Sequence, residues 1–507
     1  MSKALSLAIH PGQGLGHITL GSSLHETLSS LKSQPNVFPT IDIFYSPSEP
    51  LSTPVILNLP KNGFRLRFDG PTQRLRLIEI LDFSLNSFTY DNKALIKSGD
   101  DGTAGRRLDF RQIYDRLFGP TFPGEYIPPG LKSGSDQGSY ILSYPGIAFT
   151  FPLHDSAWSK KHDFVSLLSS SSARPAKSFV IFDGPSWQVA RKHLYLKACP
   201  NPREWSAHSR GKDLRPEEID HVAVKGDGVL DVFRRNASTF HIVLNQTTPQ
   251  DLLTELGPPD ATYRKSDRRL SIHKTRGKSR SRARSSGYES TDTGRSSYTN
   301  QDDSDGQDRL RNDESLADAA AECFYNYFHH GIDVFVSRPT ERVGSSIRGL
   351  SHSDERVDIF EPDQLVASKI LLHGNIPGSY PFNRYRRCRW TVGSDSAETD
   401  EDNVLTSEMS FSELSEQLQR GFQADSAYDG KSDNFQQGMV LNRGWGNSPG
   451  SSCELLGGWE ESDKAKERAG KSGGEDGPGL GNTTLYGFPG MVFEVLKNDK
   501  VSCLTIY

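Results

Sequence analysis

The sequence predicts an α+β fold of about four related helix-plus-antiparallel-strand units, with long disordered insertions in the third and fourth. The first observation behind this prediction is a short pattern that occurs four times, a glycine followed by near-strict alternation of apolar and other residues. Such period-2 alternation is typical of a strand with one buried face. Glycine tolerates positive φ, so it suits the point where the chain turns into the strand. The repeat-defining glycines are Gly63, Gly146, Gly331 and Gly490.

The second observation is that apolar residues at helical spacing precede each glycine-led strand. A Gly-Pro pair follows the second and third of these runs, which is a typical helix stop. An ordinary α+β chain, in which such strands arise by chance, is the alternative to a repeat. The predicted helices cover 24–31, 110–117, 252–256 and 411–418, further strands are expected at 75–80 and 501–506, and a hairpin turn at 226–228.

The predicted units cover residues 1–90, 106–200, 213–392 and 404–507. The third and fourth are longer because each contains a tract rich in Ser, Gly and charged residues, at 274–318 and 421–481. Such tracts bury too little apolar surface to offset the entropy of ordering, so we expect both to be disordered. The basic part, 274–284, is either a targeting or phospho-regulated element or an ordinary solvated loop.

The composition indicates a soluble cytosolic protein. The net charge of −5 disfavours general binding of polyanions. The five cysteines are scattered and odd in number, which fits a reducing compartment. The first 20 residues show no signal-peptide pattern, and no run approaches the roughly 18 apolar residues that a membrane-spanning helix needs.

A search for chemical motifs predicts no catalytic, metal or cofactor site. The glycines at 12–16 lack the third glycine of a dinucleotide fingerprint. Three Gly-Lys-Ser tripeptides lack the leading glycine of a phosphate loop, and the Gly-x-Ser-x-Gly pattern at 446–450 lacks the strand and helix that a nucleophile elbow requires. His329 and His330 lie near Cys323, but no further group stands at a metal-ligand spacing. We therefore expect a protein without enzymatic activity or cofactor, the alternative being an enzyme whose site has no recognisable pattern.

One segment combines arginines with aromatic residues. Arg, Tyr and Trp are enriched at interface hot spots, so this segment is a candidate for contact with a partner protein or a lipid headgroup. Strand-like alternation would place Arg384, Arg386 and Cys388 on one face. The alternatives are structural pairing of the arginines with carboxylates, and a nucleic-acid strip, which the overall acidity disfavours. The candidate contact residues are His373, Tyr380, Arg384, Tyr385, Arg386, Arg387, Arg389 and Trp390.

The same segment carries a resemblance to a known family. The chain resembles the phagosome assembly factor 1 family, and the likeness spans nearly all of the part expected to fold. It departs from the family pattern in the tracts after His273 and after Gly421, which are longer here. The matching segments are 55–59, 63–69, 73–82, 256–259, 263–266, 324–333, 373–388 and 491–495.

The resemblance implies a non-enzymatic autophagy factor, a scaffold or adaptor. It implies a WD-repeat β-propeller protein as partner, only indirect contact with membranes, and no nucleic acid. It also implies a cytoplasmic protein recruited to the preautophagosomal structure, where autophagosomes form. A factor for vesicle trafficking from the trans-Golgi network to the plasma membrane is the alternative implied by the same family.

Overall fold

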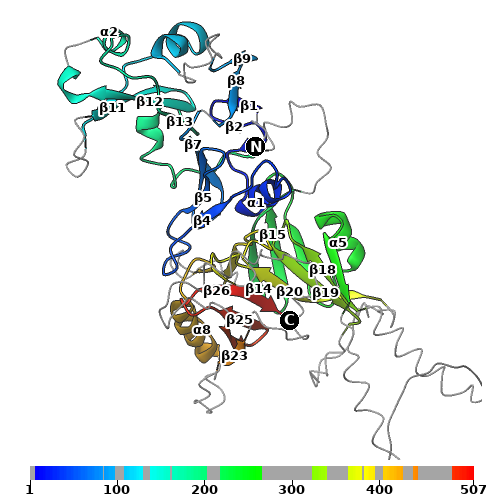
Figure 1. Ribbon diagram of the computed structural model, residues 1–507. Helices are drawn as coiled ribbons and strands as arrows, with labels where there is room; N and C mark the ends of the chain where they lie inside the picture. The colour runs from blue at the N-terminus through cyan, green and yellow to red at the C-terminus, as the bar shows by residue number, and fades with distance from the viewer. Residues whose placement is uncertain are drawn as a thin grey trace, which may run out of the picture.

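The computed structural model describes residues 6–83, 85–96, 108–129, 137–159, 163–202, 217–264, 322–339, 364–379, 382–393, 404–425, 438–442 and 482–507. These residues form two halves, one above the other in Figure 1, with the same order of sheet strands in each. No helix in these ranges is both long enough and apolar enough to cross a membrane.

The first half begins with a three-stranded antiparallel meander and a helix and continues with strands that belong to two sheets. Its elements are β1 (Ser6–His10), β2 (Gly14–Leu15), β3 (Ile18–Thr19), α1 (Leu24–Lys32), β4 (Asp42–Phe44), β5 (Val55–Leu59), β6 (Phe64–Phe68), β7 (Leu75–Ile80), β8 (Ser87–Tyr90), β9 (Lys93–Ala94), the π-helix η1 (Gln112–Leu117), β10 (Glu125–Ile127), β11 (Gln137–Tyr144), β12 (Ile147–His154), the short η2 (Asp155–Ala157), α2 (Phe164–Leu168), β13 (Ser178–Phe182) and α3 (Trp187–Ala190).

The second half repeats this plan. Its elements are β14 (Ile219–Gly226), β15 (Val229–Arg234), β16 (Phe240–Val243), α5 (Pro249–Leu256), β17 (Ala261–Arg264), β18 (Cys323–Tyr327), β19 (Ile332–Ser337), β20 (Val366–His373), β21 (Trp390–Val392), β22 (Leu405–Thr406), α8 (Phe411–Asp425), β23 (Met439–Asn442), β24 (Asn482–Phe488), β25 (Met491–Val495) and β26 (Val501–Ile506).

Each half contains one five-stranded and one eight-stranded sheet, and the strand orders correspond. The five-stranded sheets have the orders β3-β2-β1-β8-β9 and β16-β15-β14-β21-β22. The eight-stranded sheets have the orders β10-β11-β12-β13-β7-β6-β5-β4 and β23-β24-β25-β26-β20-β19-β18-β17. Each eight-stranded sheet thus joins two four-stranded meanders, through antiparallel pairing of β7 with β13 and of β20 with β26.

The four glycine-led strands occupy equivalent positions, as the sequence pattern predicts. β6, β12, β19 and β25 are each the third strand of a meander, and each meander follows a helix (α1, η1, α5 or α8). The glycine before each strand has positive φ: 71° at Gly63, 78° at Gly146, 76° at Gly331 and 71° at Gly490. The prediction of four related helix-and-strand units is confirmed. Each eight-stranded sheet contains strands of two units, so no sheet boundary marks where one unit ends. The predicted unit boundaries therefore stay predictions.

The helices form where the apolar spacing predicts them. In α1, Leu24, Leu28 and Leu31 are buried, and the Ser23 hydroxyl accepts a hydrogen bond from the Glu26 N–H, which caps the first turn. In α5, Thr248 forms a capping box with Asp251. The expected strands at 75–80 and 501–506 are β7 and β26, and the hairpin turn at 226–228 joins β14 to β15.

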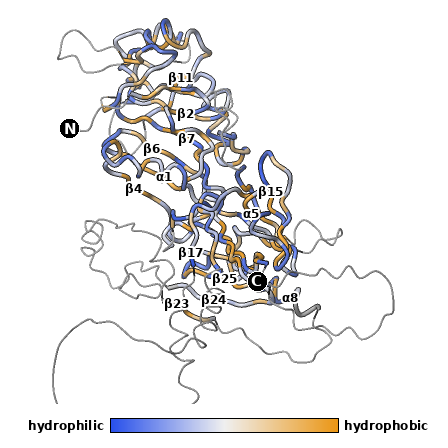
Figure 2. Tube along the Cα trace, turned by 90° about the vertical axis from the view of Figure 1, so that its right-hand side faces the viewer, coloured by the Kyte–Doolittle hydropathy of each residue, from blue (hydrophilic) through white to orange (hydrophobic). Residues whose placement is uncertain are grey.

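Each half has its own hydrophobic core. In Figure 2, orange and blue alternate along strands such as β6 and β7, consistent with the alternating burial of β6. Phe64, Phe149 and Phe179 lie in the core of the first half, and Val334, Trp390 and Phe493 in that of the second. A small separate cluster of Leu51, Ile376 and Leu496 bridges the two halves. The halves are therefore separate in their cores but in direct contact.

The predicted disordered tracts have different outcomes. The tract 274–318, including the basic part 274–284, lies outside the described residues. Within the tract 421–481, the prediction of disorder is wrong in two places, because α8 runs to Asp425 and β23 pairs with β24 at the sheet edge. Met439 and Leu441 continue a strand pattern that the surrounding polar residues obscure. The rest of that tract is outside the described residues.

Candidate functional site

The candidate site lies where the two halves meet, and one segment of the second half builds most of it. This junction segment, residues 374–389, connects β20 to β21, and its counterpart in the first half, residues 81–86, is much shorter. The junction segment contacts the turn between β6 and β7, residues 69–74, in the first half. A long loop of the second half therefore packs against a turn of the first half.

The innermost contact pairs two side-chain amides. The Gln73 Nε2 donates to the backbone carbonyl of Asn375 at 2.8 Å, and the Asn375 Nδ2 donates to the Gln73 Oε1 at 2.7 Å. Asn375 also accepts the backbone N–H of Asn383 at 2.6 Å, which folds the junction segment back on itself. Both amide side chains belong to buried residues, so their hydrogen bonds replace water that the junction excludes.

Arg387 lies beside this pair and binds both halves. Its Nε donates to the carbonyl of Pro71 and its Nη1 to the carbonyl of Gly374, both at 2.6 Å, while Nη2 reaches Glu408 at 3.5 Å. The guanidinium is almost fully buried, with 1% of the side chain exposed. Burial lowers the pKa of Arg387, and Glu408 opposes that effect. With three partner groups, this buried arginine has a structural role: it links the first half, at Pro71, to the second half, at Gly374 and Glu408.

Arg386 forms a second cross-half contact through a shared carboxylate. The Glu218 Oε2 lies 2.6 Å from the Arg74 Nη2 and 3.5 Å from the Arg386 Nη2. Arg386 also donates from Nη2 to the carbonyl of Ile219, but its buried Nη1 has no hydrogen-bond partner among the described residues. Burial lowers the pKa of Arg386 to about 10, and the neighbouring Arg74 adds to the effect. Positive charge is therefore in excess here.

Glu408 likewise serves two arginines. The Arg389 Nε donates to the Glu408 Oε1 at 2.7 Å, and the same oxygen faces Arg387. Burial opposes ionisation of Glu408, yet Arg387 and Arg389 together hold its pKa below the usual value. The carboxylate is therefore ionised at neutral pH and neutralises part of the arginine charge.

Tyr385 and His373 converge on Asp333 in β19. The Tyr385 hydroxyl donates to the Asp333 Oδ2 at 2.8 Å, and the His373 Nε2 lies 2.9 Å from the same oxygen. The two rings stack with centroids 3.7 Å apart. The other oxygen, Oδ1, accepts from the Asn326 Nδ2 at 2.8 Å. This cluster fixes the later part of the junction segment, at Tyr385, to the sheet of its own half.

The segment that combines arginines with aromatic residues is largely buried. Tyr385, Arg386, Arg387 and Trp390 are each at most 6% exposed. The predicted alternation of faces fails, because the segment before β21 is not a strand and neighbouring arginines turn to different carboxylates. Structural pairing, the alternative left open by the sequence, describes the geometry.

The remaining candidate contact residues have mixed positions. Trp390 packs edge-on against Phe493 in the core, with centroids 6.0 Å apart. Arg384 is half-buried with its guanidinium 6.0 Å from the Tyr385 ring, and Arg389 is half-buried as well, with 37% of the side chain exposed. Tyr380 lies outside the described residues. Contact of these residues with a partner or lipid stays a prediction.

A cleft of about 710 Å³ opens beside the buried arginines. The first half contributes Arg74, Arg76 and Lys197 to its lining. The second half contributes Arg234, Arg235, Arg386, Arg387 and Arg389. Sequence reasoning identified only the last three of these residues. The others lie 150 or more positions away from them, and the dibasic pair Arg234-Arg235 at the end of β15 was the one local signal.

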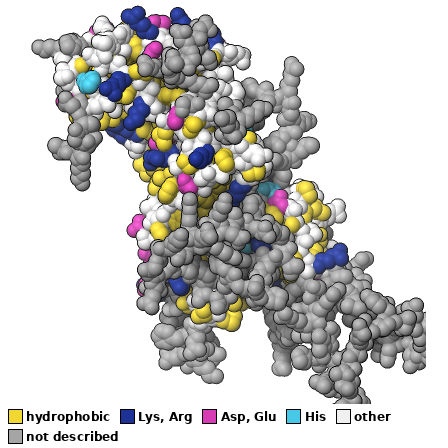
Figure 3. Space-filling model, viewed as in Figure 1, with side chains coloured by type: hydrophobic (Ala, Val, Ile, Leu, Met, Phe, Trp, Pro, Cys, Tyr) yellow, Lys and Arg dark blue, Asp and Glu magenta, His cyan; other side chains and the backbone are white. Residues whose placement is uncertain are grey.

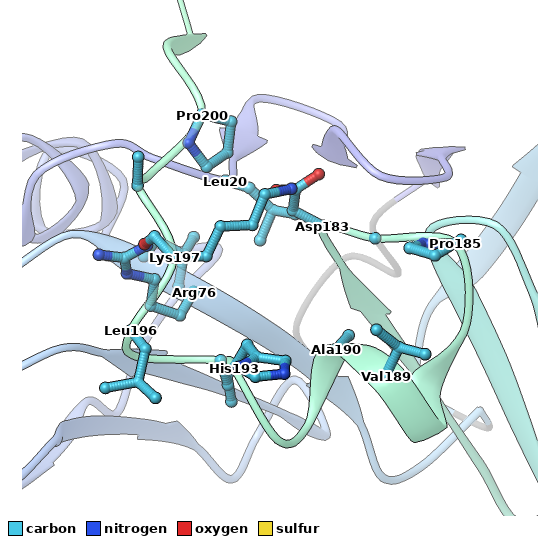
Figure 4. A pocket seen from close by; sticks show the side chains of 14 residues that line it. Leu20, Arg76, Asp183, Pro185, Val189, Ala190, His193, Leu196, Lys197 and Pro200 are labelled. Atoms are coloured by element: carbon cyan, nitrogen blue, oxygen red, sulfur yellow. The ribbon is translucent and has the colours of Figure 1, made fainter.

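A second, more apolar cavity of about 380 Å³ shares a wall with this cleft. Figure 4 shows this cavity, with Arg76 and Lys197 on one side and Val189 and Ala190 from α3 on another. The Lys197 Nζ pairs with Asp183 at 2.7 Å. Arg76 pairs with Asp69 at 2.6 Å and donates to the Lys197 carbonyl at 2.7 Å, which anchors the wall between the two cavities.

His25 of α1 also faces the junction. Burial lowers the pKa of His25 to about 4, although the Arg384 backbone and Asp260 oppose the shift. His25 is therefore neutral at physiological pH. His330, in the turn before β19, is buried as well, and burial and the nearby His329 lower its pKa well below the usual value. Among the described residues, no three His, Cys, Asp or Glu side chains are grouped so as to hold a metal ion.

The fold and the junction define a class: a tandem α+β repeat protein whose two halves are fastened by buried arginines and paired amides. The chain belongs to the Phagosome assembly factor 1 family, whose sequence profile matches residues 14–289 and 357–507. Both sides of the junction, the turn at 69–74 and the segment 374–389, fall within the matched ranges. The family resemblance seen in the sequence is confirmed.

Distant relatives align over most of the chain. A PHAF1 protein of Arabidopsis thaliana is 23% identical over 98% of this chain and 92% of its own length. A PHAF1 protein of Drosophila melanogaster is 22% identical over 99% of this chain and 94% of its own length. A PHAF1 protein of Caenorhabditis elegans is 22% identical over 74% of this chain and 73% of its own length. No solved structure matches the chain.

Proposed function

We propose that this chain is a non-enzymatic adaptor in autophagy, recruited to autophagosome-forming membranes by a WD-repeat β-propeller protein. The observation that carries the proposal is the family match over 14–289 and 357–507, because the family is described as a phagosome assembly factor. The four-unit fold supports the same interpretation, since repeated units present extended surfaces to partners.

The character of the surface also supports an adaptor. On the face that Figure 3 shows, hydrophobic side chains are interspersed with charged ones over the described part, a composition that non-obligate interfaces share with protein surfaces in general. Large apolar side chains such as Phe122 (87% exposed) and Phe44 (55% exposed) project from the first half. By contrast, the paired amides and the arginines Arg386 and Arg387 of the junction are buried and bind groups of the chain itself.

The proposal is tested by purifying the tagged full-length chain from starved cells under crosslinking and identifying proteins of near-equal amount. A WD-repeat β-propeller protein is expected among them. Depleting that protein should remove the chain from preautophagosomal structures without lowering its abundance. Recruitment that persists after depletion, or the lack of any propeller partner, would contradict the proposal.

The position of the partner contact is mapped with single alanine substitutions at two exposed apolar residues, Phe44 and Phe122. Each side chain is at least half exposed, so the fold should be unaffected. Arg420, an exposed residue of α8 with 74% of its side chain accessible, is the matched control for substitution as such. Unchanged melting temperatures separate loss of contact from loss of structure.

A further inference from the structure

The cleft between the halves concentrates more positive charge than its carboxylates neutralise. Its seven arginines and one lysine are paired with or lie near six carboxylates of the described part of the chain: Asp69, Asp183, Glu218, Asp220, Glu255 and Glu408. Two of these, Glu218 and Glu408, are each shared between two arginines. The cleft therefore keeps an excess of positive charge, although the chain as a whole is acidic.

Two N–H donor groups of arginines that line the cleft have no acceptor among the described residues. The Nη1 of Arg386, a residue 6% exposed, and the buried Nη1 of Arg235 have no hydrogen-bond partner among the described residues. Leaving a buried, charged donor unpaired is costly, and native proteins usually supply such groups with a partner, whether protein, ordered water, a ligand or an ion. Both side chains line the same cleft, so an anion bound there would lie near both guanidinium groups.

The size and lining of the cleft restrict the anion. A volume of about 710 Å³ is in the range of sites for small molecules. Arginine forks match the oxygens of phosphate groups in bidentate geometry. Arginines stand on both walls, since Arg74 and Arg76 come from the first half and Arg235, Arg386 and Arg389 from the second. The single carboxylate of Glu218 already spans Arg74 and Arg386, so a ligand with more than one anionic group could pair with further arginines of both walls at once.

We propose that this cleft binds a small molecule with two or more phosphate groups, such as an inositol polyphosphate or the headgroup of a polyphosphorylated phosphoinositide. The anion would lie between the two halves and add a bridge to the junction. Its binding is independent of the partner contact proposed above.

The test uses the full-length chain, with inositol hexakisphosphate as the soluble probe and vesicles containing phosphatidylinositol bisphosphate as the lipid probe. Calorimetric titration should give saturable binding of at least one probe at physiological salt. Arg235→Gln should weaken that binding at least tenfold. Arg191→Gln, which removes a partly exposed arginine paired with Glu125 outside the cleft, should leave it unchanged.

Arg389→Gln is a second variant in case Arg235→Gln does not fold, because its side chain is more open and its loss should weaken binding in the same direction. Binding of the soluble probe alone identifies a free inositol phosphate as the source, and binding of the vesicles identifies a lipid. The proposal is overturned if neither probe binds, or if both cleft variants bind as tightly as Arg191→Gln. Equal binding of inositol hexasulfate by all variants would also overturn it, as it would show charge attraction without a phosphate site.

Discussion

Gln73 and Asn375, 302 positions apart, form a reciprocal hydrogen-bonded pair across the junction of the two halves. Both residues are buried and both have positive φ, 51° and 45°, conformations that cost free energy for a side chain other than glycine. The pair therefore offsets local backbone strain with hydrogen bonds that exist only when the halves are in contact.

The first prediction is that the two amides are energetically coupled. Gln73→Ala or Asn375→Ala leaves a buried polar group unpaired and should lower the free energy of unfolding by about 2 kcal/mol each. A double-mutant cycle measured by urea denaturation should give a coupling of about 1 kcal/mol or more. Gln419→Ala, on the exposed face of α8, is the control and should change stability little. Strictly additive losses would show that the amides do not act as a pair.

The second prediction concerns the arginine segment. Replacing Arg384, Tyr385 and Arg386 together by alanine should destabilise the fold by at least about 3 kcal/mol, because Glu218 and Asp333 lose buried partners. Thermal unfolding followed by circular dichroism measures the loss, with Arg420→Ala as the exposed control. An unchanged melting temperature would contradict a structural role of these three residues and would favour the contact with a partner or lipid headgroup that the sequence also predicts.

The third prediction compares two equivalent glycines of the repeat. Gly331 and Gly490 have nearly the same φ, 76° and 71°, so alanine at either position should cost about 1 kcal/mol for the left-handed backbone. At Gly331, however, the added Cβ would overlap the carbonyl oxygen of Arg386 in the junction segment. At Gly490 the nearest atom, the Tyr507 carbonyl oxygen, is 3.6 Å away.

Gly331→Ala should therefore be clearly more destabilising than Gly490→Ala in chemical denaturation. Equal losses would mean that the junction segment does not lie over Gly331. The comparison needs no further control, since each variant carries the same substitution at the same place in the repeat.

The fourth prediction is a loss of stability in mild acid. The folded-state pKa of His25 is about 4, below the unfolded value of about 6.5, so the unfolded chain takes up the proton first as the pH falls. Above pH 6.5 His25 is mainly neutral in both states and the free energy of unfolding is unaffected. Between pH 6.5 and 5 the free energy of unfolding should fall by about 2 kcal/mol. His330, whose pKa is also lowered, adds a loss in the same direction.

His25→Gln should reduce the slope of melting temperature against pH between 6.5 and 5, whereas the same substitution at the exposed His10 should not. Both variants are measured in buffers of equal ionic strength. An identical slope in wild type and His25→Gln would show that protonation of His25 does not cause the loss of stability in mild acid.

Local structure was largely predictable from the sequence, because its signals are local. The glycine before β19, the apolar spacing of α5 and the Gly-Asp-Gly turn each act within a few residues. The pairing of β7 with β13 and of β20 with β26 was not predictable, because these strands lie far apart in the chain and many strands share their apolar pattern.

The site shows the same division. Arg386 and Arg387 were recognised as unusual, but their burial depends on Glu218, Pro71 and Glu408 from distant segments. No local pattern shows that a carboxylate will face a given arginine. The apolar residues Cys388 and Trp390, both at most 2% exposed, stand next to these arginines in the sequence and were a signal of burial. The number of basic residues around them made this signal hard to recognise.

The central claim is that two halves with separate cores are held as one body by the junction. Differential scanning calorimetry of the wild type and of a variant carrying Asn375→Ala and Arg387→Met tests it most directly. The wild type should unfold in one main transition, and the variant in two, because each half keeps its core but loses the contacts that couple it to the other. Two transitions in the wild type, with the same temperatures in the variant, would contradict the claim.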